Sequence, residues 1–136
     1  MLKARQGQKF KNLQLSVSVI LVVSIALYYG FYPMEIFPGL FDFKADSDDL
    51  KGILTSIMTL YFGMSALWLV GIFDAGFWRT ATLVNVIFMA SLSLGRIMAM
   101  LLYGLPSDCF TIGTSAELVL AFWGFLNLRK YGQAIV

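Results

Sequence analysis

Histidine is absent from this chain of 136 residues, and Cys109 is its only cysteine. These absences exclude zinc cages, cysteine–histidine nucleophiles and membrane thiol-oxidoreductase pairs, all of which rely on those side chains. The sequence also has no glycine-rich phosphate loop and no serine nucleophile elbow. Seven methionines offer soft sulfur atoms, but without His or Cys partners they favour flexible packing. We therefore predict no metal site and no cofactor.

Charged residues are also scarce, at 13% of the chain, whereas hydrophobic residues make up 59%. A soluble domain carries about 25% charged residues, and so small a core cannot bury this much apolar surface. The surplus surface needs lipid as its solvent, and four segments approach the ~20 residues of a spanning helix. They cover about residues 13–32, 53–73, 81–102 and 112–128. We predict an all-α integral membrane four-helix bundle, a single domain over residues 1–136, with a short fourth span.

The basic residues predict how the bundle is oriented in the membrane. Lys44 and Lys51 lie on one side of the predicted spans, and seven basic residues lie on the other. These seven are Lys3, Arg5, Lys9, Lys11, Arg79, Arg129 and Lys130. The positive-inside rule places both termini in the cytoplasm, and we expect a bacterial cytoplasmic (inner) membrane. No long basic patch calls for nucleic acid as a partner, and the first apolar run is too long for a cleaved signal peptide.

The first outer connection, from Pro33 to Gly52, has two parts. Residues 33–43 contain prolines and aromatic residues, which favour a segment at the membrane interface that forms a lid over the bundle. The aspartates that follow lack the glycine and the terminal glutamate of an EF-hand calcium loop. We expect Asp46 or Ser47 to cap the second helix, with acidic residues in its first turn.

Two charged residues lie inside predicted spans, where the bilayer makes them costly. Arg96 lies six residues before Leu102, the end of the third span, and Glu117 lies five residues after Ile112, the start of the fourth. If the YGLPSD turn joins the two segments as a hairpin, a rise of ~1.5 Å per residue puts both charges roughly 8 to 9 Å below the same surface. Opposite charges at equal depth on neighbouring helices predict an intramembrane ion pair.

Small residues recur at four-residue spacing beside this predicted pair. They are Ser91, Gly95 and Ala99 on the third span and Gly113 and Ala121 on the fourth. Such faces let another backbone approach closely, so we expect them to dock helices or a partner, with the face that bears Glu117 covered by protein. Asn85 and Asn127 lie at comparable depth near the inner end, which predicts that a hydrogen bond between their side-chain amides joins the third and fourth spans a second time.

The first two spans carry fewer polar signals. On the second, Tyr61 offers a phenol that can reach the bundle interior. The polar residues of the first are mainly serines and tyrosines, so we expect this helix to be the most exposed to lipid.

The stretch from Gly63 to Lys130 resembles the bacterial four-helix membrane family catalogued as domain of unknown function 4345. The elements that carry the resemblance are Gly95 with Arg96, Gly104 with Pro106 and Ser107, and Glu117 with Leu118. Family members often have an acidic residue just before the turn glycine, where this chain has Tyr103, although Asp108 is a possible substitute. The resemblance implies the four-helix architecture and no established activity. A likeness to DoxX-type four-helix proteins rests on size and topology alone.

Three classes of function remain open. In the first and best supported, the protein is an accessory or assembly subunit that binds a membrane protein or a second copy of itself, and the ion pair fixes the register of its helices. In the second, an outer-half pocket binds or transports a small anionic or lipidic molecule. Its candidate polar residues are Arg96, Glu117, Tyr61, Tyr103, Ser107 and Asp108. In the third, Glu117 is the general acid or base of a membrane enzyme, assisted by Tyr103 or Asp108.

Overall fold

The computed structural model describes residues 2–31 and 45–132, with side chains from residue 10 onward. Within these residues the chain forms four α-helices. They are α1 (Leu2–Phe31), α2 (Asp48–Phe73), α3 (Trp78–Tyr103) and α4 (Asp108–Tyr131). Each holds a stretch long and apolar enough to cross a membrane, so the predicted all-α, four-helix membrane architecture is confirmed. The fourth span is not short, because α4 has 24 residues. The predicted interfacial segment, residues 33–43, lies outside the described residues.

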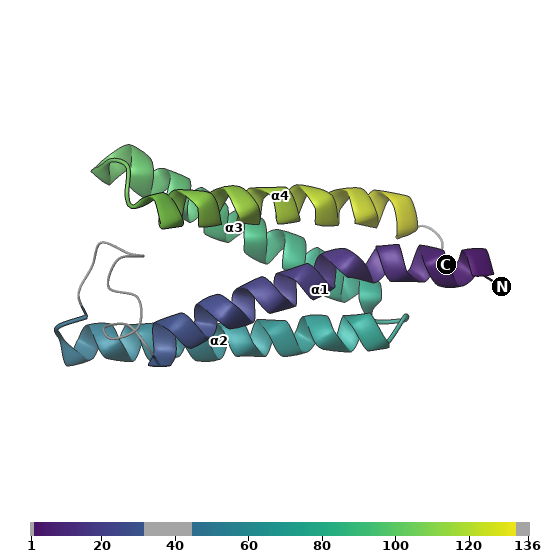
Figure 1. Cartoon of the computed structure of the whole chain (residues 1–136), viewed down its shortest axis with the longest axis horizontal. Coiled ribbons are helices and arrows are strands. Elements are labelled where there is room, and N and C mark those ends of the chain that lie inside the picture. The colour runs from purple at the N-terminus through teal and green to yellow at the C-terminus, as the bar shows by residue number, and fades with distance from the viewer. Residues whose placement is uncertain (1, 32–44, 133–136) are drawn as a thin grey trace.

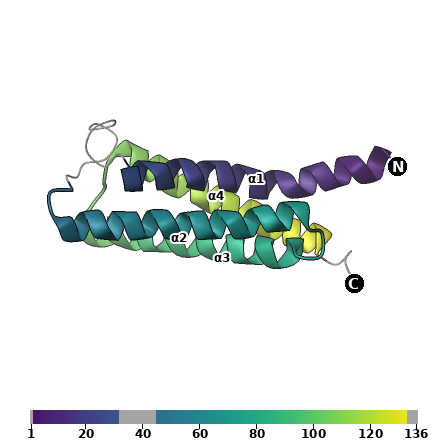
Figure 2. The same cartoon turned by 90° about the horizontal axis from the view of Figure 1, so that it is seen from below.

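The four helices form two antiparallel hairpins, α1 with α2 and α3 with α4 (Figure 1). The start of α1 and the end of α4 lie at the end of the bundle where α2 connects to α3, here termed the α2–α3 end. The opposite end, which carries the α3–α4 turn, is termed the α3–α4 end. Figure 2 shows α1 and α2 side by side at the front, with α4 behind α1 and α3 behind α2. The two hairpins diverge toward the α3–α4 end in Figure 1.

Local sequence explains where α2 begins and where α3 ends. The Ser47 hydroxyl accepts a hydrogen bond from the Leu50 N–H at 3.2 Å, and Asp48 and Asp49 occupy the first turn of α2. The predicted cap is therefore confirmed. Helix α3 ends at Tyr103 and is capped by Gly104, whose φ of 92° lies in the left-handed region that favours glycine. The chain then turns within a few residues, which brings α4 back antiparallel to α3.

The interior of the bundle is rich in polar side chains and its outside is apolar. Among the side chains that the structure describes, ten polar or charged ones are buried: Gln14, Ser18, Ser65, Thr82, Asn85, Ser93, Arg96, Thr114, Glu117 and Asn127. Large hydrophobic side chains such as Ile20, Leu101 and Phe122 are exposed on the outer faces. A soluble protein has the reverse arrangement. Lipid as the surrounding solvent explains both the exposed leucines and the inward-facing polar groups.

Helix α1 is not the most lipid-exposed helix, contrary to the expectation from its composition. It buries Gln14, Leu15, Ser18, Val22 and Ala26, each no more than 1% exposed. These residues recur about every four positions and form one inward stripe. Helix α3 has the smallest buried share among the four apolar stretches. The expectation considered the serines and tyrosines of α1 and missed Gln14, whose side chain bonds this helix to α3 and α4.

Candidate functional site: a buried ion pair in the α3–α4 hairpin

Arg96 of α3 and Glu117 of α4 form an ion pair inside the hairpin, as the depth count predicts. Arg96 Nη2 lies 3.2 Å from Glu117 Oε1, and the two residues are only 8% and 1% exposed. The pair is therefore shielded from lipid and lies at matched depth on the two helices. Removing either charge would leave the other unpaired in a low-dielectric interior.

Two residues near the start of α4 enclose the guanidinium. Arg96 Cζ lies 4.6 Å from the centroid of the Phe110 ring, which is a cation–π contact. A β-carbon on Gly113 would lie 3.1 Å from Arg96 Nη1, so this glycine makes room for the side chain of Arg96 and not for a helix backbone. Phe110 was not identified from the sequence, although its spacing of seven residues from Glu117 places it on the same face of α4.

Two phenols from the other hairpin lie close to the pair. Tyr61 of α2 is 5% exposed, and its ring meets that of Tyr29 of α1 edge to face, with 6.3 Å between the centroids. Both phenols are near enough to interact electrostatically with Arg96 and Glu117. The polar site in this half of the bundle thus draws on all four helices. Tyr29 is a second residue that sequence reasoning missed.

Two residues of the α3–α4 turn, Tyr103 and Asp108, do not join this cluster. Tyr103 is 87% exposed, and Asp108 is exposed in the first turn of α4. Ser107 precedes α4, and its carbonyl accepts backbone N–H groups of the first turn. The structure therefore does not bring Tyr103 or Asp108 to Glu117, and the enzymatic interpretation loses its assisting groups. No group of three or more metal-ligating His, Cys, Asp or Glu side chains occurs among the residues that the structure describes.

A second polar cluster lies toward the α2–α3 end and is centred on Gln14 of α1. Gln14 Nε2 donates to Asn85 Oδ1 of α3 at 2.6 Å and to the Leu120 carbonyl of α4 at 3.2 Å. Ser18, one turn along α1, contributes a further bond to Asn85 Oδ1 at 3.5 Å. One side chain thereby connects α1 to both helices of the other hairpin.

The predicted amide bond between Asn85 and Asn127 is wrong. The side-chain nitrogens of both residues have no hydrogen-bond partner among the described residues, and the Asn85 oxygen is taken by Gln14. Gln14 can reach this position because Gly124 of α4 has no side chain. A β-carbon at Gly124 would lie 3.1 Å from Gln14 Nε2 and 2.6 Å from Val86 Cγ2.

The small-residue faces of α3 and α4 differ in how far they are buried. Ala121 of α4 is 8% exposed, so the face that bears Glu117 is covered by protein. On α3, Ser91 and Gly95 are exposed and Ala99 is half-buried. A β-carbon at Gly95 would meet nothing within 4 Å. The α3 stripe therefore faces outward, with Ser91 at the edge of a groove between α2 and α3, and within the described part of the chain no helix packs on it.

A family model described as a domain of unknown function (DUF4345) matches residues 10–128. Neither the curated proteins nor the solved structures provide a match. The family match extends the resemblance seen from Gly63 to Lys130 over the first two helices as well. Because it covers most of the chain, the protein belongs to the DUF4345 family.

Proposed function

We propose that this integral membrane protein is an accessory or assembly subunit whose α3–α4 hairpin is held in register by the Arg96–Glu117 pair. The observation that carries the proposal is the contact between the two buried side chains. Arg96 Nη2 lies 3.2 Å from Glu117 Oε1, and the residues are 8% and 1% exposed. A buried pair adds little net stability over apolar packing, but a shift in register would strand both charges. Such a pair suits a protein that presents one fixed surface to a partner.

The exposed side of α3 supplies that surface. Ser91 and Gly95 lie one turn apart on it, with open space beyond Gly95. In a membrane, close backbone approach at small residues allows the van der Waals packing that drives helix association. Arg96 follows Gly95 directly and points into the bundle, so the ion pair sets the direction in which the stripe faces. The partner is a transmembrane helix of another protein or of a second copy.

Replacing Gly95 with leucine should keep the protein folded and weaken the complex about tenfold or more. The fold tolerates the change because nothing lies within 4 Å of a β-carbon there, and losing ~1 to 2 kcal/mol of helix packing corresponds to roughly that factor. Chemical crosslinking in membranes and native gels in mild detergent measure the complex. Gly63→Leu, at an equally open glycine on α2, is the matched control. A complex that survives Gly95→Leu contradicts docking on this stripe.

We further propose that the α2–α3 end faces the cytoplasm, in a bacterial cytoplasmic membrane. Arg79, Arg129 and Lys130 lie at this end, and Lys51 lies at the start of α2, at the other end. Short loops with more basic residues stay inside.

Cys109 provides a direct test of this orientation. It lies in the first turn of α4 and is partly exposed. A membrane-impermeant maleimide should label it from outside intact cells. A cysteine placed at the exposed Thr80 position, as Thr80→Cys with Cys109→Ser, should be labelled only after the cells are permeabilised. The reverse pattern would invert the proposed orientation.

A second candidate function, binding of a small molecule beside the pair, is favoured by one observation. Neither carboxylate oxygen of Glu117 has a well-aligned hydrogen bond, although Oε1 lies 3.2 Å from Arg96. The guanidinium has five N–H donors, more than one carboxylate uses. A small anionic or lipidic molecule that offers both acceptors and a donor would satisfy these groups, and the pair would then be a binding site as well as a clasp.

A further inference from the structure

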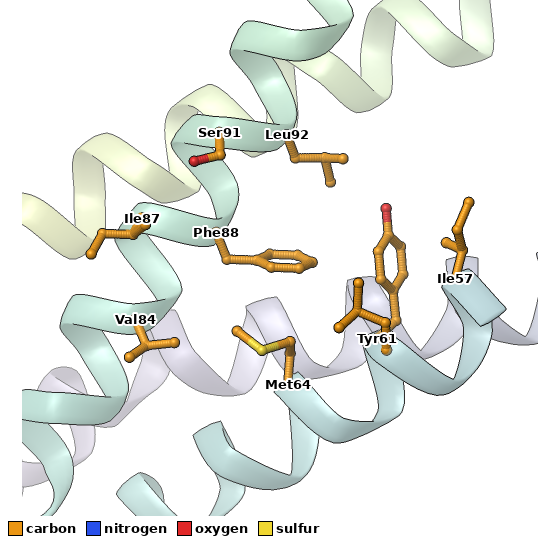
Figure 3. Close-up of a pocket in the computed structure, with 9 residues that line it drawn as sticks. Ile57, Tyr61, Met64, Val84, Ile87, Phe88, Ser91 and Leu92 are labelled. Carbon is orange, nitrogen blue, oxygen red and sulfur yellow. The ribbon is translucent and has the colours of Figure 1, made fainter.

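An apolar groove of about 600 Å³ lies between α2 and α3. Figure 3 shows Tyr61 and Met64 rising from α2 toward Phe88 and Leu92 of α3. The groove opens to the bilayer, because Leu60 on its α2 side is 57% exposed. Its lining is almost entirely hydrocarbon, so its natural content in a membrane is hydrocarbon as well.

The groove exists because α2 and α3 are close only near the α2–α3 end. There Gly71 packs so tightly on α3 that a β-carbon would overlap that of Ala81. Farther along, the aromatic rings of Tyr61 and Phe88 bridge the two helices edge to face, with 5.4 Å between their centroids. These rings form the floor of the groove, and the divergence of the hairpins in Figure 1 opens it above them.

A second hollow, of about 700 Å³, continues the groove along α2 toward the α3–α4 end. The two share Ile57 and Leu60 as lining residues, and the second ends at Asp48 and Asp49 in the first turn of α2. At a rise of ~1.5 Å per residue, the path from Asp48 to Met64 is roughly 24 Å long. It runs from a helix terminus at the membrane surface into the hydrocarbon layer, which is the course of a lipid with its headgroup outside and one chain inside.

The mouth of this path is acidic. Asp46, Asp48 and Asp49 are exposed there, and Lys51 is 3.3 Å from Asp48. Three carboxylates and one ammonium give this group of four side chains a charge of −2. The partial positive charge of the helix terminus, roughly half an elementary charge, reduces this value without cancelling it. A headgroup that carries an ammonium is attracted to such a mouth, and one that carries only a phosphate is repelled.

We propose that the groove binds an amine-bearing membrane lipid, with its ammonium group at Asp48 and Asp49 and one acyl chain lying between Leu60 and Ile87. The chain leaves bulk hydrocarbon for an equally apolar groove, so it contributes shape and dispersion contacts and little transfer free energy. Selectivity therefore comes from the headgroup. The inference goes beyond the assembly role, because lipid binding in this groove needs no protein partner.

Native mass spectrometry of the protein from vesicles with equal amounts of dioleoyl phosphatidylethanolamine and phosphatidylglycerol tests the proposal. We expect a bound lipid with a severalfold preference for phosphatidylethanolamine. The variant Asp48→Asn with Asp49→Asn should keep a bound lipid and lose the preference. Leu60→Trp, which fills the groove, should lose the lipid. Val119→Trp, at an outward residue of α4 that is 64% exposed against 57% for Leu60, should keep both lipid and preference.

Three results would overturn the proposal. The first is equal binding of the two lipids by the wild type, and the second is an unchanged preference after both aspartates are neutralised. The third is disulfide crosslinking between two copies of Leu60→Cys in a Cys109→Ser background, which would show a second copy in the groove. If Leu60→Trp does not fold, Ile87→Phe on the opposite wall replaces it. The Gly95→Leu readout is a protein complex and not a lipid, so failures of the two proposals are distinguishable.

Discussion

Arg96→Met should lower the free energy of unfolding by about 3 to 5 kcal/mol, whereas Arg96→Met combined with Glu117→Leu should leave stability close to that of the wild type. The single change strands the carboxylate of Glu117, which is 1% exposed, in a low-dielectric interior. The double change replaces the pair with apolar side chains of similar size, so no charge remains buried. Glu117→Leu alone should likewise be destabilising, because it strands the guanidinium.

Thermal melting in mild detergent, followed by circular dichroism, measures these differences. Arg79→Met is the matched control, because Arg79 is an exposed arginine at the α2–α3 end and its loss strands no buried charge. If the double variant is as unstable as the singles, the pair is not a clasp that apolar packing can replace. If it is stable but loses a small molecule that native mass spectrometry finds on the wild type, the second candidate function gains support.

The ion pair could be predicted from the sequence because its geometry depends only on the rise per residue of the two helices and on the turn that joins them. The rise per residue is constant, and the turn between Tyr103 and Asp108 sets both helices to a common origin. Counting from that turn places Arg96 and Glu117 at one depth, whatever the rest of the bundle does. The cap at Ser47 was accessible for a similar reason, since it depends only on the adjacent turn.

Contacts between the two hairpins could not be predicted in this way. The helical period shows which residues share a face, but it does not show which face points inward. The spacing of Ser91 and Gly95 therefore predicts a packing face, whereas in the structure both residues are exposed. Gln14, the second residue of the first predicted span, was not identified from the sequence, because its partners lie 71 and 106 positions away. Tyr29 and Tyr61 approach the ion pair only because the α1–α2 hairpin docks on the other.

Gly124→Leu should be strongly damaging at the place where α1 docks on the α3–α4 hairpin, with a loss of about 1 to 3 kcal/mol or more. A β-carbon alone would lie 2.6 Å from Val86 Cγ2 and 3.1 Å from Gln14 Nε2. Leucine would therefore force Gln14 away from Asn85 and the Leu120 carbonyl, which would lose buried hydrogen bonds as well as strain the packing. Melting temperature and the protease resistance of α1 in detergent report the loss.

The matched control is Gly95→Leu, because it makes the same substitution in a neighbouring helix where a β-carbon meets nothing within 4 Å. The gain in helix propensity, about 1 kcal/mol, is common to both variants and cancels in the comparison. Adding Gln14→Ala separates the two causes of the damage. If displacement of Gln14 dominates, Gly124→Leu should cost less in the Gln14→Ala background, by a coupling of roughly 0.5 to 3 kcal/mol. An unchanged cost would assign the damage to Val86, and Gln14 would then not be the side chain that requires a glycine at position 124.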